Sequence, residues 1–196
     1  METKEKWVWK GCESVEFFVK SAYSLLRGEE AEDCPKMYNF FLRIKALPSA
    51  HVTTWRVIEN KIATKVNLER RGVQVKSNLC CLCRVLEEST SHLFFGCRVT
   101  WLAWNLCYVW LGVSSINILS PGSHIEQFKI LDATTSVNLI LGNVWIALVS
   151  EIWRHINIFL FNKGVVDYFE VFCLAHVKVW SWISSKVPST SFLFFD

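Results

Sequence analysis

The sequence CCLCRVLEESTSHLFFGC, residues 80–97, carries four side chains of the kinds that bind zinc. Cys80 and Cys83 form a C-x2-C pair, eight residues separate Cys83 from His92, and four more separate His92 from Cys97. Structural zinc sites are closed tetrahedra of thiolate and imidazole ligands, and a C-x2-C turn can point two sulfur atoms at one ion. We therefore predict a structural zinc site with Cys80, Cys83, His92 and Cys97 as ligands, and we call residues 80–97 the zinc unit.

Two alternatives to this ligand set remain open from the sequence. Cys81 could replace Cys80, although the one-residue spacer between Cys81 and Cys83 fits a shared ion less well. The cysteines could also be buried free thiols beside a core histidine. The remaining cysteines and histidines have no recognisable partner spacing, and we expect ordinary packing or surface roles for them: Cys12, Cys34, Cys107, Cys173, His51, His124, His155 and His176.

The second half of the zinc unit needs its own turn to reach the ion. We expect Ser89 or Thr90 to begin a short helix that presents His92, and Gly96 to permit a backbone reversal toward Cys97. Four protein ligands leave no position for an activated water, so the site is expected to be structural and not catalytic. The sequence also lacks the common nucleophile, phosphate-loop and metalloprotease motifs, so we expect no enzyme activity.

The composition favours a mostly α-helical fold. The chain has 196 residues, 52% of them hydrophobic, with ten Trp and fourteen Phe but only four Pro and eight Gly. The opening METKEKWVWKG is not patterned as a secretory signal, so the cysteines are expected to be reduced, in the nucleus or cytoplasm. The apolar run 139–150 is shorter than the roughly 20 residues that span a bilayer, which favours a buried core helix and no membrane partner.

Apolar periodicity predicts several helices before the zinc unit. One covers 17–26, a second follows Pro35, and a third begins at Pro48. Thr64 should cap a short helix that Gly72 ends, and 73–79 alternates enough to predict an extended strand.

The chain after the zinc unit divides into a helix, a connector and a helical hairpin. The first helix should end at Gly112, and the connector contains the turn-forming sequence Ser120-Pro-Gly-Ser. Two long apolar helices are predicted over about 137–162 and 167–185. The expected organisation is a small helical domain over 1–112, a connector over 113–136 and C-terminal apolar helices over 137–196.

Positive charge is concentrated just before the zinc unit. Residues 36–84 contain ten basic side chains against Glu59 and Glu69, a net charge of +8, whereas residues 1–35 have a net charge of −3. Such a surplus suits a phosphate backbone, so contact with RNA or DNA is predicted; a merely solvated helix face is the alternative. We call the predicted contact residues the basic stretch: Arg56, Lys61, Lys65, Arg70, Arg71, Lys76 and Arg84.

Several motifs in order resemble one known family. They are FFVKSAYSLL over 17–26, Trp55-Arg56, Ala63-Thr64 with NLERRGV over 67–73, the CCLC and EESTSHLFFGC parts of the zinc unit, and IWRHINIF over 152–159. Together they resemble the reverse transcriptase zinc-binding domain, which follows the polymerase in plant LINE-type non-LTR retrotransposons. The resemblance extends over roughly Trp7 to Trp182. Two positions depart from the family pattern: Thr54 stands where an aromatic is usual, and His51-Val52 where a Lys-Val pair is usual.

The resemblance implies the same four zinc ligands, Cys80, Cys83, His92 and Cys97. It also implies contact with template RNA or DNA, or docking on a reverse transcriptase polymerase domain. The sequence contains neither a YxDD-type polymerase motif nor a ribonuclease H carboxylate set. We therefore expect a non-enzymatic fragment of a retroelement polyprotein. A scaffold that docks on the polymerase without binding nucleic acid is the alternative function.

Overall fold

The computed structural model describes residues 36–114, 118–128, 134–162 and 164–184. The chain divides into two compact units, Met1–Phe40 and Phe41–Asp196. The first unit is described only from residue 36, so the helix predicted over 17–26 lies outside the described residues. The described part is mostly α-helical, as predicted. The separate predicted division at 113–136 stays a prediction.

The helices that precede the zinc unit begin where the sequence predicts, although the first of them ends at Arg43, before the break predicted at Leu47-Pro48. α2 covers Lys36–Arg43 and α3 covers Pro48–Ile58, with Pro48 at the first position, where its missing N–H is not needed. α4 covers Lys65–Arg70; the Thr64 hydroxyl caps it by accepting the N–H of Asn67 at 3.4 Å. Gly72 follows α4 with a φ of +79°, the left-handed conformation that glycine adopts most easily.

The strand predicted over 73–79 is wrong. Within the described ranges, the extended pairing here is one isolated antiparallel bridge between Leu79 and Glu87. Val73 and Leu79 are both exposed, so the alternation of apolar residues does not mark a face that packs against a core. A strand needs partners along its length that satisfy its backbone groups. Here the pairing is confined to the bridge, where the N–H of Glu88 donates to the carbonyl oxygen of Asn78 at 2.8 Å, and it does not extend back to Val73.

Two elements follow the zinc unit. α5 covers Arg98–Leu111 and ends at Gly112 with a φ of +65°, as predicted. The predicted loop connector is wrong in one part, because Pro121–Glu126 forms the short helix α6. Pro121 occupies its first position, and His124 and Ile125 are buried. Ser120-Pro121 therefore begins a helix here. The burial of His124 and Ile125 in the core outweighs the preference of this Pro- and Gly-containing sequence for a turn.

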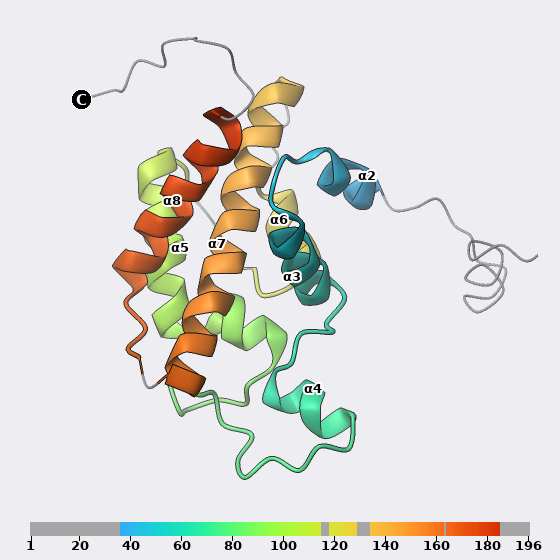
Figure 1. Cartoon of the computed structure of the whole chain (residues 1–196), viewed down its shortest axis with the longest axis vertical. Coiled ribbons are helices and arrows are strands. Elements are labelled where there is room, and N and C mark those ends of the chain that lie inside the picture. Colours follow the sequence, from blue (N-terminus) through green and yellow to red (C-terminus); the bar gives the residue numbers. More distant parts are fainter. Residues whose placement is uncertain (1–35, 115–117, 129–133, 163, 185–196) are drawn as a thin grey trace, which may run out of the picture. The chain divides into compact units, whose positions relative to one another are not determined.

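A helical hairpin closes the chain and supplies the centre of the core. α7 covers Thr135–Asn162 and α8 covers Tyr168–Ser184, close to the predicted bounds. α7 packs against α8 and α3, while α5 packs against α8 and the zinc unit (Figure 1). By length and composition α7 could cross a membrane, yet 67% of its most apolar window is buried in the protein. Residues 141–150 are all buried, which confirms the predicted core helix.

His124 lies at the centre of an aromatic cluster where α5, α6 and α7 meet. The indole N–H of Trp145 donates to Nδ1 of His124 at 2.9 Å, and Nε2 lies 3.0 Å from the Tyr108 hydroxyl. The rings of Phe95 and Trp104 lie 4.4 and 4.5 Å from the imidazole, centroid to centroid. Burial lowers the pKa of His124 from 6.5 to about 4, so the imidazole is neutral at neutral pH.

The lowered pKa makes a prediction about stability and pH. The unfolded chain binds a proton at His124 near pH 6.5 and the folded chain only near pH 4, so stability falls as pH falls through that window. Between about pH 7.5 and about pH 5.5 the free energy of unfolding should drop by about 1 kcal/mol through this group. Urea denaturation at both pH values measures the drop. His124→Gln, which does not titrate, should lose that part of the pH dependence; an identical dependence in both proteins would contradict the assignment.

Candidate metal centre

The four predicted ligand residues lie together. Each of Cys80, Cys83, His92 and Cys97 offers one ligand atom, and these four atoms all lie within 4.8 Å of one another. The sulfur atoms of Cys80 and Cys97 are 3.9 Å apart, and Sγ of Cys83 is 3.2 Å from Nε2 of His92. A tetrahedral zinc with Zn–S bonds of about 2.3 Å holds its sulfurs about 3.8 Å apart. The donor set and its spacing therefore fit one zinc ion.

Burial favours a structural role for this centre. Cys80 and Cys97 are fully buried, while Cys83 and His92 are half-buried. All four side chains would be used by a tetrahedral ion, which leaves no position for a reacting water. Among the described residues, this is the group of His, Cys, Asp and Glu side chains that could hold a metal ion.

A tight turn forms the C-x2-C half of the centre. The N–H of Cys80 donates to the carbonyl oxygen of Leu86 at 2.7 Å, and that of Arg84 donates to the carbonyl oxygen of Cys80 at 2.9 Å. Arg84 closes the turn with a φ of +56°. Hydrogen bonds from the Cys81 and Cys97 thiols, and then from backbone N–H groups within the turn, lower the pKa of the Cys80 thiol despite its burial. The turn thus favours the thiolate, the form that binds zinc.

Cys81 lies beside the ligand group but is not part of it. Its backbone N–H donates to Oε2 of Glu88 at 2.8 Å, and Cys81 is not one of the four residues whose ligand atoms converge. A hydrogen bond with Cys80, burial and the Glu88 carboxylate all raise the pKa of the Cys81 thiol. The geometry therefore favours Cys80 over Cys81 as the ligand.

The second half of the centre is a single π-helical turn, η1, over His92–Gly96. The Ser89 hydroxyl accepts the N–H of His92 at 3.1 Å, in line with the predicted start of a helical turn near that residue. Between the two ligands His92 and Cys97, the side chains of Leu93, Phe94 and Phe95 are buried in the core. The turn therefore holds two ligands toward the ion while it anchors the zinc unit to the core.

The predicted role of Gly96 is wrong. Gly96 is not in the left-handed region, so it does not act by permitting a backbone reversal. Its constraint is space, because a Cβ added there would lie 3.2 Å from Cδ2 of Leu119 and 3.6 Å from Nδ1 of His92. A side chain at this position would press on Leu119, while its contact with the His92 ring would be an ordinary van der Waals one.

A buried carboxylate ties α4 to the zinc unit. Glu88 is 3% exposed, and its oxygens accept the backbone N–H groups of Lys65 at 3.2 Å and Cys81 at 2.8 Å. Lys65 is the first residue of α4, where a negative charge is favoured by the helix dipole, and its ammonium lies 3.7 Å from the same carboxylate. Glu88 therefore fixes the C-x2-C turn and the start of α4 together.

A second polar contact lies beside the first. The buried side-chain amide of Asn67 lies 2.9 Å from the carbonyl oxygen of Asn60, 3.0 Å from that of Ile62 and 3.3 Å from the Thr90 hydroxyl. The Thr90 hydroxyl donates to Oδ1 of Asn60 at 2.6 Å. Buried polar groups that are all partnered hold their segments in one arrangement, so the turn before α4 and the zinc unit move as one piece.

The residues of the basic stretch are not equivalent. Six are exposed, whereas Lys65 is half-buried and its ammonium donates to the carbonyl oxygen of Leu79 at 2.6 Å. Lys61 pairs with Glu59 at 3.2 Å and lies 4.8 Å from the centroid of the Trp55 ring. Arg71 donates to the carbonyl oxygen of Lys61 at 2.6 Å. Lys65 therefore supports the fold, and its neighbours carry the exposed charge.

The expectation that His155 lacks a carboxylate partner is wrong. Glu151 is fully buried on α7; Nε of Arg154 lies 2.7 Å and Nε2 of His155 lies 3.7 Å from its Oε2. Lys178 of α8 also pairs with it. Burial, and then the Arg154 cation, lower the pKa of His155. The i, i+3 and i, i+4 spacings from Glu151 were visible in the sequence and could have predicted this cluster.

The other lone residues fit the ordinary roles expected of them. Cys107 is buried, which raises the pKa of its thiol to about 12, and Cys173 is half-buried on α8. His124 belongs to the aromatic core. Cys12 and Cys34 lie outside the described residues.

Residues 17–104 match the family model described as zinc-binding in reverse transcriptase. This part of the chain is similar to the zinc-binding domain associated with reverse transcriptases. All four converging ligands and the whole basic stretch lie inside the matched range, and zinc is the cofactor that the family and the donor set share. The family is a zinc-binding one and not a catalytic one. No curated protein and no solved structure matches the chain.

Loss of one ligand should remove the metal. Cys97→Ser replaces a buried thiolate with a neutral hydroxyl, so the purified chain should hold far less than one zinc per molecule. Elemental analysis measures the content, and hydrogen exchange at Leu93, Phe94 and Phe95 should show loss of protection in the same variant. Cys173→Ser, a change at a half-buried cysteine on α8, is the matched control and should keep its zinc. Equal zinc in both variants would contradict the ligand assignment.

Loss of the Glu88 charge should weaken zinc binding without removing a ligand. Glu88→Gln leaves the amides of Cys81 and Lys65 with a weaker acceptor, and changes behind metal ligands typically lower affinity about 10- to 100-fold. Competition with a chromophoric chelator measures the affinity. Glu87→Gln, the same change at the exposed neighbour, should bind zinc as the wild type does. An equal affinity for all three proteins would show that Glu88 does not position the turn.

Proposed function

We propose that the chain is a non-enzymatic zinc-binding module, derived from the reverse transcriptase polyprotein of a non-LTR retrotransposon, that binds RNA or DNA through its basic stretch. The observation that carries the proposal is the attachment of α4 to the zinc unit by Glu88. Because of it, the zinc ion holds in place the helix that bears Arg70 and precedes Arg71. The plant retroelement origin rests on the resemblance of the ordered motifs in the sequence.

The charges of the basic stretch suit a phosphate backbone. Arg56, Arg70, Arg71, Lys76 and Arg84 are all exposed. Within residues 36–84 the acidic side chains are Glu59, which pairs with Lys61, and Glu69, which accepts a hydrogen bond from Asn78. When Lys and Arg side chains contact the phosphates of a nucleic acid, they release counterions that were condensed on it. This release favours binding and makes the affinity depend on salt.

The charge of α4 and its C-terminal end should govern that binding. Arg70→Glu with Arg71→Glu should weaken binding to RNA or DNA and lower the slope of log affinity against log salt by about 1 to 2. Fluorescence anisotropy at several salt concentrations measures both. Arg43→Glu with Lys45→Glu changes the net charge equally, at exposed positions outside the basic stretch, and should have a smaller effect. Equal effects of the two pairs would mean that net charge, and not this surface, controls binding.

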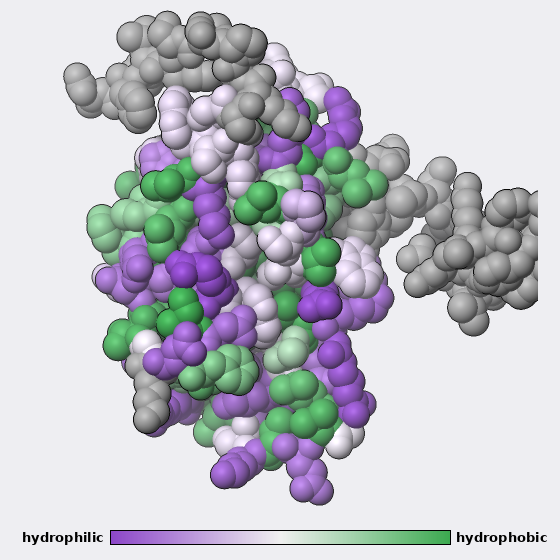
Figure 2. Space-filling model, in the orientation of Figure 1, coloured by the Kyte–Doolittle hydropathy of each residue, from purple (hydrophilic) through white to green (hydrophobic). Residues whose placement is uncertain are grey.

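An alternative function is a scaffold that docks on a polymerase domain. Apolar side chains of α5 and α8, among them Val109, Trp110 and Val177, are exposed. On the face shown in Figure 2, however, apolar side chains lie among hydrophilic ones and do not form one continuous apolar area. If the chain binds neither RNA nor DNA, and if it self-associates until a polymerase region is added, this alternative replaces the first proposal.

A further inference from the structure

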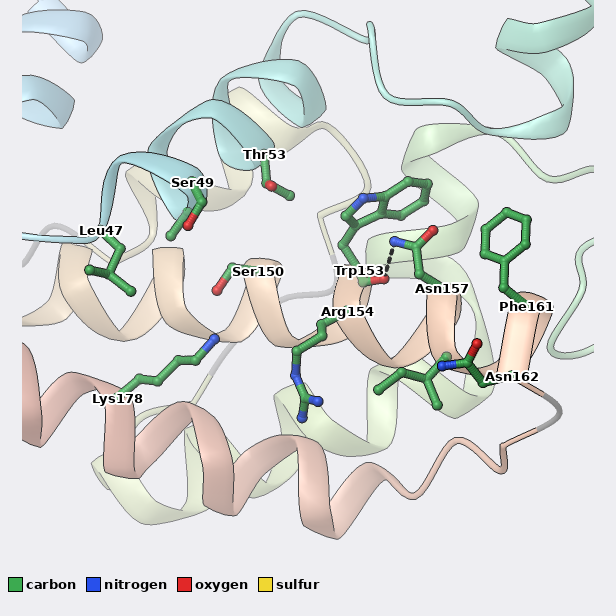
Figure 3. A pocket seen from close by; sticks show the side chains of 12 residues that line it. Leu47, Ser49, Thr53, Ser150, Trp153, Arg154, Asn157, Phe161, Asn162 and Lys178 are labelled. Atoms are coloured by element: carbon green, nitrogen blue, oxygen red, sulfur yellow. Dashed lines mark hydrogen bonds between the residues drawn. The ribbon is translucent and has the colours of Figure 1, made fainter.

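Two hollows meet along one face of α7. The first, about 460 Å³, lies among α3, α7 and α8 and is drawn in Figure 3. The second, about 510 Å³, is lined by α4, the segment 75–77, Glu88 and α7. Both are lined by Trp153, Asn157 and Phe161. We call the two hollows together the α7 groove.

Cationic side chains line both parts of the α7 groove. Arg154 and Lys178 line the first part, and Lys65 and Lys76 line the second. Two carboxylates oppose them, Glu151 beside the first pair and Glu88 beside Lys65, and both carboxylates are buried. Four cations against two carboxylates leave the groove with a positive surplus, so it favours an anionic ligand.

Aromatic side chains form the floor that the two parts share. Trp153 is half-buried, and its ring stacks on Phe94 with centroids 6.1 Å apart and an interplanar angle of 27°. Phe161, two turns further along α7, is 78% exposed. In Figure 3, Thr53 of α3 lies beside Trp153, whereas Ser49 of α3 and Lys178 of α8 lie toward the other end of the hollow, away from Phe161. Proteins bind single-stranded nucleic acids by stacking bases on aromatic rings that have cations beside them, and Trp153 and Phe161 could serve as such rings.

We propose that the α7 groove binds a single-stranded nucleic acid, with bases stacked on Phe161 and Trp153 and phosphates beside Lys76 and Lys178. This proposal rests on the proposed nucleic-acid function and names a second surface for it, which shares Lys65 and Lys76 with the basic stretch. A base can stack on a side chain only when it is not paired within a duplex, so the groove discriminates single strands from double strands.

The zinc unit supports this surface directly. Phe94, on which Trp153 stacks, lies in η1 between the ligands His92 and Cys97. Removal of the ion releases η1 and therefore the ring beneath Trp153. The groove accordingly belongs to the zinc-loaded protein, and the experiment uses the full chain with its zinc.

The test measures binding of fluorescein-labelled oligouridylate and oligothymidylate of about 12 nucleotides, and of a duplex of the same length, by anisotropy. Phe161→Ala should weaken binding of one or both single strands about 5- to 100-fold, with duplex binding and the salt slope unchanged. Because Phe161 is 78% exposed, this variant should fold. Phe169→Ala, at a phenylalanine of α8 that is 59% exposed and does not line the groove, is the matched control.

A second variant tests the phosphate contacts. Lys76→Gln should lower the salt slope for single strands by about 0.7, which Phe161→Ala does not do. If the wild type binds single strands and Phe161→Ala binds them equally well, the groove proposal is overturned while the proposed function stands. If the wild type binds no nucleic acid, both fail. If Phe161→Ala loses affinity for an acidic oligoglutamate peptide but not for nucleic acid, the groove is a protein-binding site and the proposal is overturned.

Discussion

Three sulfur atoms and one imidazole nitrogen must converge on a single ion before the zinc unit and α4 have a fixed arrangement. The C-x2-C turn and η1 each hold two of these ligands, and neither segment contains a regular strand or a long helix that could hold it alone. The free energy of zinc binding therefore acts as folding free energy for this region. The helices of the hairpin have a different source of order, because α7 buries a continuous apolar run.

The zinc unit transmits this constraint in two directions. On one side, Glu88 and the Asn67 contacts fix α4, and with it the exposed arginines at and beyond its C-terminal end. On the other side, Phe94 and Phe95 enter the core, where Phe94 supports Trp153 and Phe95 stacks on Trp145. A small site with no reactive position thus positions two surfaces that carry cationic side chains. This is how a structural metal can be required for binding without touching the bound molecule.

Sequence reasoning succeeded where short-range chemistry decides the structure. The ligand spacing, the proline at Pro48, the Thr64 cap and the glycines at Gly72 and Gly112 all act within a few residues, so the sequence alone predicts each of them. It failed where a distant partner decides. Residues 73–79 lack a strand to pair with, and the helix at Pro121–Glu126 exists because His124 and Ile125 enter the core. The four-residue spacing of Glu151 and His155 was readable, but their burial beneath α8 was not.

The same distinction separates the two cationic surfaces. The basic stretch is contiguous in sequence, so its charge could be counted directly; its effect is long-ranged, screened by salt and indifferent to base identity. The α7 groove brings together cations from α4, the segment 75–77, α7 and α8. Folding places Lys65 beside Glu88 and Lys178 beside Glu151, pairs that are distant in the sequence. The surplus charge of the groove is smaller, and under the proposal its discrimination comes from bases that stack on its aromatic side chains. If the basic stretch makes the first contact with a nucleic acid and the α7 groove then binds a single strand, the two surfaces must keep a fixed position relative to each other. The zinc unit contacts both surfaces and can hold them in that position.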